Sequence, residues 1–432
     1  MLIESLSRPK RGWAMVSALL VALNPAADAA QKIPLSIAAA GAVGDGVTLN
    51  TTVIQTAIDQ LAGKGGGTLV IPPGEFLTGA IFRKPGVNLH LDQGAVLKGS
   101  TNIEHYPALE TRIEGHTQVW RPALVNATKT DHLRITGEGA IHGGGKPFWD
   151  AFLNRRAADL NTRNLDVDRP RNLFISDSKD VRISGISLRD SGFWNLHLFR
   201  CRDVVIEKLD IRAPRPSPST DGIDLDSCQN VIIRNCFISV NDDNIALKGN
   251  KGPFALNDKE IPPVEHIRIS DCSFGLGGSV LTLGSEASVV RDVVMENCKL
   301  TGTEKNCVLR LKVRLDTPQV YQNITVRNIT VDNPAANVIS IEGWKQYFDL
   351  QGQPAPSQMI DHVTLANITG TLNAFGRIDG PKTSTVQNVA LQNIDIQVKD
   401  PRMVINQVKN LELKNMKING AAYTGDPPAA GK

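Results

Sequence analysis

A short pattern of alternating apolar and polar residues recurs nine times between residues 179 and 418. Typical copies are QNVIIRNCFI from Gln229, QNITVRNITV from Gln322 and QNVALQNIDI from Gln387, and successive copies begin 22 to 39 residues apart. Alternation with period two means that each strand buries one face. A unit of this size that stacks on its neighbours is typical of one coil of a parallel β-helix. The repeat therefore predicts an all-β solenoid.

Two upstream segments, GVNLHLDQGAVLKG from Gly86 and DHLRITGEGAIHGGG from Asp131, are interpreted as earlier, less regular coils. Before them, residues 51–67 place Ile54, Ala57, Ile58 and Leu61 at helical spacing. An amphipathic helix here is expected to cap the open end of the stack, whose exposed edge would otherwise invite aggregation. No linker divides the chain, so residues 31–432 are predicted to form one catalytic β-helix domain.

The first 30 residues have the pattern of a secretory signal peptide. Arg8, Lys10 and Arg11 precede the apolar run Trp13–Leu23, and the small-residue site Ala27-Asp28-Ala29 follows. The run is short for a membrane span, although an uncleaved anchor is the alternative. We expect a periplasmic or secreted protein that has no membrane segment after cleavage. A net charge of +3 over 432 residues gives no concentrated basic face, so nucleic acid is not an expected partner.

The six cysteines show no metal-site spacing such as C-x-x-C. Several follow an asparagine or aspartate at one position of the repeat, in RNC, SDC and ENC. We expect the Asn and Cys residues to form internal ladders at a turn, with buried thiols, and one disulfide remains an alternative. The Asn-x-Thr sequons at Asn323, Asn328 and Asn367 are interpreted as products of the repeat rather than as glycan sites.

Apolar pairs put the central coils in register. The pairs are Ile223/Leu225, Ile245/Leu247, Leu281/Leu283 and Leu309/Leu311, and the residues two positions before them are Asp221, Asp243, Ser279 and Cys307. Asp221 and Asp243 are therefore expected to be neighbours on adjacent coils, about 4.8 Å apart, with Asp242 beside them. The outward positions of the same strands hold Arg310 and Lys312 two coils further on.

Three crowded carboxyl groups cannot all ionise freely, so at least one pKa rises. One protonated and one ionised carboxyl group are what glycoside hydrolysis uses. The Arg310 and Lys312 side chains suit an anionic substituent such as a uronate carboxylate. Calcium binding by the same carboxylates is an alternative, since calcium takes oxygen ligands. Asp224 and Asp226 are expected to be solvated charges on the strand face, which is the usual place for Asp.

At these residues the chain resembles glycoside hydrolase family 28, the polygalacturonase family. The family's Asn-Thr-Asp, Asp-Asp and Arg-Ile-Lys motifs are matched by STDG from Ser219, NDDNIALKG from Asn241 and RLK from Arg310. Further similar segments include FWNLHLFRC, LTLGSE and IHGGGKPFWD, and the resemblance runs from about Ala38 to about Asn419. It implies a right-handed, single-stranded parallel β-helix and metal-independent hydrolysis of galacturonate-containing pectic glycans with inversion. No cofactor is expected, and we expect a monomer.

Carried over by position, the resemblance makes Asp242 the general acid. Asp221 and Asp243 would hold and activate water, while Arg310 and Lys312 would bind the galacturonate. We also assign Ser219, Lys248 and Ser279 to substrate binding. Ser219 stands where the family has Asn, and GLGGSV lacks the family's histidine, whose place falls at Ser279 or, with a one-residue shift, Gly278. Closely spaced carboxylates alone would favour retention. We follow the family and expect inversion. The stacking of the coils fixes only the distance between Asp221 and Asp243, and not the distance between the acid and the base on either side of the sugar.

Two other classes of function stay open. A β-helix polysaccharide lyase would use calcium on the carboxylates with Lys248 or Arg310 as the proton acceptor. A non-catalytic glycan-binding β-helix would fit the missing histidine. Linkage, endo or exo action and disulfide pairing are not fixed by the sequence. His197 is expected to pack beneath the groove, the aromatic segment Trp344–Phe348 to stack on sugar or anchor a loop, and an insertion containing Trp120 and Arg121 to wall the groove.

Overall fold

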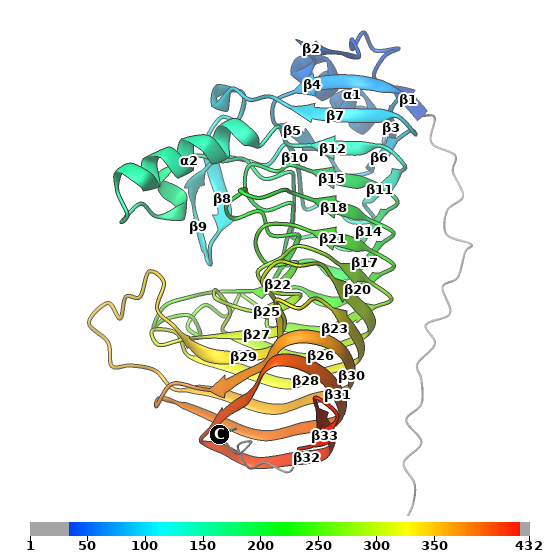
Figure 1. Ribbon diagram of the computed structural model, residues 1–432. Helices are drawn as coiled ribbons and strands as arrows, with labels where there is room; N and C mark the ends of the chain where they lie inside the picture. The colour runs from blue at the N-terminus through cyan, green and yellow to red at the C-terminus, as the bar shows by residue number, and fades with distance from the viewer. Residues whose placement is uncertain (1–33, 424–432) are drawn as a thin grey trace, which may run out of the picture. The chain divides into compact units, whose positions relative to one another are not determined.

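A computed structural model describes residues 34–423, and their strands form one right-handed parallel β-helix (Figure 1). The coils stack through three parallel ladders, and from β26 onward one long strand can belong to more than one of them. The predicted signal peptide, residues 1–30, lies outside the described residues. Among residues 34–423, no helix is both long and apolar enough to cross a membrane.

Ladder 1 carries the site described below. Its strands are β5 (Ile81–Arg83), β10 (Val125–Thr128), β13 (Leu173–Ser176), β16 (Leu196–Phe199), β19 (Ile223–Asp226), β22 (Ile245–Lys248), β25 (Leu281–Leu283), β27 (Asn306–Arg314) and β29 (Ala336–Trp344).

Ladder 2 runs along the whole described stack. Its strands are β1 (Pro34–Ser36), β3 (Gly67–Ile71), β6 (Val87–Leu91), β11 (Arg134–Gly137), β14 (Lys179–Ser184), β17 (Arg202–Glu207), β20 (Gln229–Arg234), β23 (Val264–Ser270), β26 (Val289–Thr301), β28 (Gln319–Asp332), β30 (Gln358–Asp379), β31 (Ser384–Asn406) and β32 (Val408–Ile418). The short β33 (Ala421–Ala422) turns back antiparallel on β32.

Ladder 3 consists of β2 (Asp45–Leu49), β4 (Gly74–Thr78), β7 (Ala95–Gly99), β12 (Ala140–His142), β15 (Ser187–Arg189), β18 (Asp210–Arg212), β21 (Phe237–Ser239) and β24 (Ser273–Phe274). From β26 onward, single long strands of ladder 2 continue into the position of ladder 3. The two upstream segments predicted to be coils form β6, β7, β11 and β12, which confirms that interpretation.

Inward-facing aliphatic side chains fill the coil stack. Ile223, Ile245, Leu281 and Leu309 follow one another in ladder 1 and are all fully buried. Removing one such side chain to Ala would cost about 2–5 kcal/mol, since each is packed from the coils above and below. This column fixes the register of the polar residues that precede it.

The helix α1 (Thr51–Gly63) packs on β3, β5 and β6 at the N-terminal end of the stack (Figure 1). Its buried residues are Ile54, Ala57, Ile58 and Leu61, the four that the helical spacing selected. The predicted capping helix is confirmed.

The turns between ladders 2 and 3 carry left-handed asparagines. Asn297, Asn328 and Asn367 have φ of 54–56°, a region that Asn tolerates better than most residues. Their amides form a hydrogen-bonded ladder along the stack, with Nδ2 to Oδ1 distances of 2.9 Å and 2.8 Å. The expectation of an internal Asn ladder is wrong, because these side chains are exposed and the residues that follow them, Cys298, Ile329 and Ile368, point inward.

All six cysteines are buried and free. Cys236, Cys272 and Cys298 follow one another on successive coils at the same turn. The prediction of stacked, buried thiols is confirmed, and the alternative of a disulfide is not realised.

Two insertions lie between a ladder 3 strand and the ladder 1 strand that follows it, and the sequence analysis did not predict their secondary structure. The first contains the short 3-10 helix η2 (Ile103–His105) and the antiparallel pair β8 (Leu109–Ile113) and β9 (His116–Trp120). The second contains α2 (Lys146–Ala158) and the 3-10 helix η3 (Asn164–Asp166). Both protrude on the same side of the stack (Figure 1).

Candidate active site

The register deduced from the apolar pairs is present in ladder 1. Ile223 pairs with Ile245, Ile245 with Leu281, and Leu281 with Leu309. The Gly222 amide donates to the Asp243 carbonyl at 2.9 Å, and the Asn244 amide donates to the Ser279 carbonyl at 2.7 Å. Asp221, Asp243 and Ser279 therefore form a column just before β19, β22 and β25.

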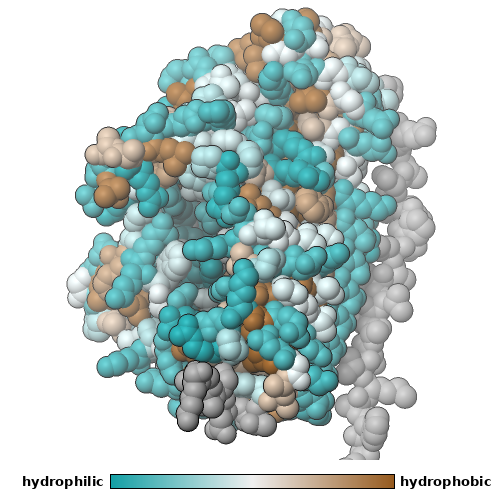
Figure 2. Space-filling model, in the orientation of Figure 1, coloured by the Kyte–Doolittle hydropathy of each residue, from teal (hydrophilic) through white to brown (hydrophobic). Residues whose placement is uncertain are grey.

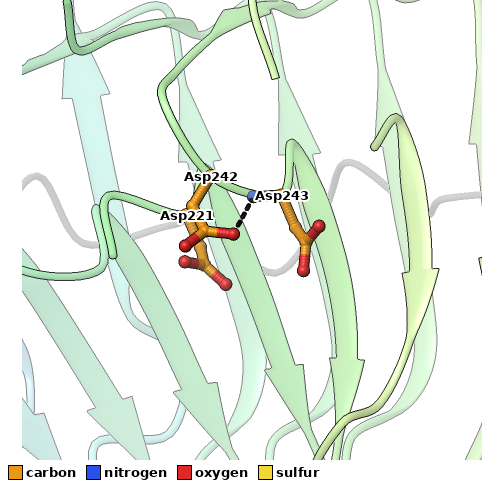
Figure 3. Close-up of side chains that lie close together, drawn as sticks. All are labelled: Asp221, Asp242 and Asp243. Carbon is orange, nitrogen blue, oxygen red and sulfur yellow. Dashed lines mark hydrogen bonds between the residues drawn. The ribbon is translucent and has the colours of Figure 1, made fainter. Parts of the chain in front are cut away.

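The carboxyl groups of Asp221, Asp242 and Asp243 meet at this point (Figure 3). One oxygen of each lies within 4.8 Å of the others. The Asp243 amide donates to Oδ1 of Asp242 at 3.0 Å, which holds the Asp242 carboxyl group against the turn. Asp221 and Asp243 are buried, while Asp242 is half-buried.

The three carboxyl groups differ in their pKa values. Burial and the charge of Asp243 raise the pKa of Asp242. Burial also raises the pKa of Asp243, but Lys312, Arg310 and Lys248 outweigh burial and hold that pKa at about 2. Burial and the charge of Asp224 raise the pKa of Asp221 well above its usual range. The pair Asp242–Asp243 thus favours one protonated and one ionised carboxyl group, as the sequence suggested.

Lys312 and Arg310 extend from β27 toward these carboxylates. The Lys312 Nζ lies 2.7 Å from Oδ2 of Asp243. Arg310 forms no ion pair within residues 34–423, and its buried Nε has no hydrogen-bond partner there. A guanidinium held in this way is available to an anionic ligand.

Lys248 is the centre of a buried charge cluster. Its Nζ lies 3.3 Å from Asp221, 3.4 Å from Asp224 and 3.5 Å from Glu286, and 4.5 Å from the Trp194 ring centroid. Burial lowers the pKa of Lys248, but the three carboxylates outweigh it and raise that pKa. Glu286 was not singled out from the sequence, because its position after β25 gave no sign that it would face Lys248.

The expectation that Asp224 and Asp226 are solvated is wrong, since both are fully buried. Burial raises the pKa of Asp224 to about 7 despite Lys248. Asp226 accepts hydrogen bonds from Arg112 at 2.8 Å and 3.2 Å, and Arg112 lies in β8. The outward face of these coils is covered by the inserted segments, so an outward position there is not a solvated one.

His197 packs beneath this layer, as predicted, between the rings of Phe174 and Trp194. Burial lowers its pKa to about 3, so the ring is neutral at ordinary pH. It does not line the cavity of the carboxylates.

A cavity of about 300 Å³ opens over the carboxylates. Among the predicted site residues, Ser219, Lys248, Arg310 and Lys312 line it with the three aspartates. Ser279 is fully buried outside this lining, and its hydroxyl donates to Oδ1 of Asp243 at 2.8 Å. A Cβ at Gly278 would lie 3.2 Å from Asp243 Oδ1 and 3.5 Å from Asp242 Oδ1, so Gly278 is the position from which a side chain would reach both carboxylates.

Further residues complete the cavity, and among them only Trp344, in the segment expected to stack on sugar or anchor a loop, was singled out from the sequence. They are Glu114, Phe152, Arg156, Asn164, Trp194, Pro218, Asn241, Ser285, Glu286, Trp344 and Gln346. In Figure 2 the surface is hollowed between the protruding α2 segment and the lobe below it.

The aromatic segment after β29 has two separate functions. Trp344 lines the cavity, and its ring centroid lies 4.8 Å from Lys312 Nζ. Tyr347 anchors the loop, since its hydroxyl accepts a hydrogen bond from the Asn164 amide at 2.9 Å. Trp120 and Arg121 lie at the end of the β8–β9 pair, so the predicted insertion is present and stands beside the cavity.

Comparison with known proteins agrees with this arrangement. The family model for glycosyl hydrolases family 28 matches residues 68–422. A probable polygalacturonase of Vitis vinifera is 27% identical over 399 residues, which cover 90% of this chain and 79% of the relative. An endo-polygalacturonase of Pectobacterium carotovorum subsp. carotovorum is 26% identical and covers 84% of this chain and 87% of its own.

The fold has solved counterparts as well. A hyperthermoactive exopolygalacturonase from Thermotoga maritima superimposes with a TM-score of 0.77 at 23% identity, over 90% of this chain and 93% of its own. The match of the family model across most of the described coils, together with the three carboxyl groups gathered just before β19 and β22, shows that the chain belongs to glycoside hydrolase family 28.

Proposed function

We propose that this chain hydrolyses glycosidic bonds next to galacturonate in pectic poly- or oligosaccharides, as the names of its relatives suggest for them. The observation that carries the proposal is the contrast between Asp242, whose pKa is raised, and Asp243, whose pKa is held at about 2. Neighbouring acid and base forms are what glycoside hydrolysis requires.

In the proposed reaction, protonated Asp242 donates its proton to the glycosidic oxygen while the bond to the anomeric carbon breaks. A water molecule held by Asp221 and Asp243 forms the new bond to that carbon, and its proton passes to the ionised Asp243. Attack from the side opposite the leaving group inverts the anomeric configuration. Proton exchange with solvent then restores both carboxyl groups.

The cations have two proposed roles. Arg310, with its unpartnered Nε, binds the galacturonate carboxylate, and Lys312 contacts the same group while it keeps Asp243 ionised. Ser219 and Lys248 line the cavity and are proposed to contact substrate. Ser279 is better assigned to positioning Asp243, because it is buried and bonded to that carboxylate.

Calcium-dependent elimination has weaker support. The three carboxyl groups are close enough to hold a cation. However, Lys312 already lies 2.7 Å from Asp243 and Lys248 lies 3.3 Å from Asp221, and each ammonium repels a second cation.

We infer that the enzyme is exported, because its first 30 residues have the pattern of a secretory signal peptide.

A product assay tests the proposal. Polygalacturonate and rhamnogalacturonan oligosaccharides are incubated with wild type and Asp242→Asn in the presence of a chelator, and both new reducing ends and unsaturated ends are followed. Saturated products that vanish in Asp242→Asn support hydrolysis and identify the substrate. Unsaturated products that need calcium, or no product from any pectic glycan, contradict it. An NMR spectrum of the first product tests inversion, since retention would leave the anomeric configuration unchanged.

A further inference from the structure

The paired strands β8 and β9, called here the crossing hairpin (residues 109–120), pack over the ladder 1 strands beside the carboxylates. Trp120, at its base, packs in one apolar cluster with Phe193 and Trp194, which lie before β16, and Ile113, next to its turn, joins the same cluster. At its tip, Gly115 approaches the Gly249 carbonyl, which lies just after β22. The crossing hairpin thus reaches from the start of the ladder 1 strands to their end.

Buried polar contacts fix it in this place. Arg112 makes its bidentate pair with Asp226 at the end of β19. Arg171 donates to the Arg112 carbonyl at 2.8 Å and to the Thr111 hydroxyl at 2.9 Å. Glu114 lies 3.6 Å from Lys251 and accepts from the Asn164 amide group at 2.8 Å. These contacts join the crossing hairpin to both edges of the groove.

The loop after β29, on the opposite wall of the groove, contacts the insertion around η3. The Asn164 amide donates to the Tyr347 hydroxyl, and the Arg163 guanidinium lies 5.6 Å from the centroid of the Tyr347 ring. Tyr347 follows β29, whereas Arg163 and Asn164 belong to the insertion around η3. The cavity over the carboxylates is therefore lined by Phe152 and Trp194, by Glu114 of the crossing hairpin, and by Asn164, which bonds both Glu114 and Tyr347.

On the C-terminal side the groove continues. A second hollow, of about 600 Å³, shares Asn241 and Arg310 with the carboxylate cavity. It extends along later coils to Lys399, and its charged lining residues are Arg215, Lys305, Arg310 and Lys399. These are all cations, so an anionic chain would be attracted to this side. Gly277 and Gly278 also line this second hollow and add no side chains to it.

From this asymmetry we infer that the enzyme acts from a chain end, with the terminal sugar in the closed carboxylate cavity and the rest of the anionic chain along the basic hollow. The crossing hairpin is the element that excludes an internal segment of a polymer. The inference rests on the proposed function and adds the mode of action to it.

Two substrates that differ only in the blocked end test the inference in the wild-type enzyme. One oligogalacturonate of defined length carries a tag on its reducing end, and the other carries an unsaturated sugar at its non-reducing end. We expect one block to abolish cleavage and the other to leave it unchanged, with a single product size from the first time points. With polygalacturonate as the substrate, the viscosity of the solution should fall only slightly for each new reducing end that is formed.

A variant in which a short Gly-Ser segment replaces residues 110–119 opens the barrier. Mixed product sizes and a faster fall of viscosity per bond cleaved are expected. Val119→Ser is the matched control, because Val119 is 71% exposed on the crossing hairpin, and it should behave as wild type. If the replacement variant does not fold, the end-blocked substrates decide alone.

The outcomes separate the two proposals. A mixture of product sizes from wild type, with both blocked substrates cleaved equally, overturns the chain-end mode and leaves hydrolysis standing. No cleavage of any pectic glycan overturns the proposed function and the chain-end mode with it.

Discussion

The Lys312 Nζ lies 2.7 Å from Oδ2 of Asp243, and both groups are nine-tenths or more buried. This ion pair joins β27 to the turn before β22, two coils away. Burial raises the pKa of Asp243, and the Lys312 ammonium acts against burial and lowers that pKa. The pair keeps the proposed base ionised in acid.

Replacing Lys312 by Met should move the acidic limb of the pH profile of kcat/KM to higher pH. The acidic limb reports protonation of the base, and loss of the ammonium raises the pKa of Asp243 from about 2. Lys345→Met is the matched control, since Lys345 is exposed and should leave the limb in place. An unchanged limb in Lys312→Met, with only KM altered, would restrict Lys312 to substrate binding.

Asp242→Asn should lower kcat by about 10²–10⁴-fold, which is the usual contribution of a positioned general acid. The amide keeps the shape of the side chain and can still accept the hydrogen bond from the Asp243 amide, so oligosaccharide binding should persist. Calorimetric titration checks binding while a reducing-end assay checks turnover. A variant that retains most of its kcat would remove Asp242 from the acid role.

Much of this site was predictable because a solenoid repeats its register. Ile223, Ile245 and Leu281 fixed the column, and Asp221 and Asp243 then had to be neighbours. The cysteine column and the capping helix followed from the same periodicity. The outward neighbours were mispredicted, because Asp226 pairs with Arg112, which is 114 residues away in an insertion with no repeat.

The same limit explains the residues that were missed. Glu114, Phe152 and Asn164 reach the cavity from insertions whose path over ladder 1 is set by tertiary packing. No spacing in the sequence relates them to the coils they cover. Glu286 does lie in the repeat, but only the burial of Lys248 beside it shows its part in the charge cluster.

The Asp224→Asn variant should weaken the pH dependence of stability between about pH 4 and 7. The pKa of Asp224 is raised from 3.8 to about 7, so its contribution to stability is fully present below pH 3.8 and is lost as the pH rises through 7. Wild-type Tm should therefore fall between about pH 4 and 7 more than that of Asp224→Asn. Equal slopes in thermal scans would show that another group carries the titration.

Arg112→Met should destabilise the protein by about 3–5 kcal/mol, because it leaves Asp226 buried without its partner. Thermal unfolding measures the loss, and proteolysis within residues 109–120 shows whether the crossing hairpin is released. The double variant Arg112→Met/Asp226→Asn should recover part of the Tm, since the uncompensated charge is gone. A single variant as stable as wild type would mean that Arg171 and the apolar contacts of Trp120 hold the hairpin alone.

Gly278→His tests the position left open beside the carboxylates. A Cβ there would approach Asp243 Oδ1 at 3.2 Å, so the side chain enters with a small adjustment and places an imidazole near Asp242. A protonated imidazole favours the ionised carboxylate, so the pKa of Asp242 should fall and the alkaline limb of kcat/KM should move to lower pH. Gly278→Leu controls for bulk and should leave that limb unmoved.

The neighbouring glycine provides the contrast for this last prediction. A Cβ at Gly277 would lie 2.5 Å from Oδ1 of Asn244, whose amide donates to the Leu276 carbonyl at 2.9 Å. Gly277→Ala should therefore lower stability by about 1–3 kcal/mol, as overpacking does, without a shift in the pH profile. If both glycine variants shift the alkaline limb equally, the effect comes from displacement of the turn and not from the charge of the imidazole.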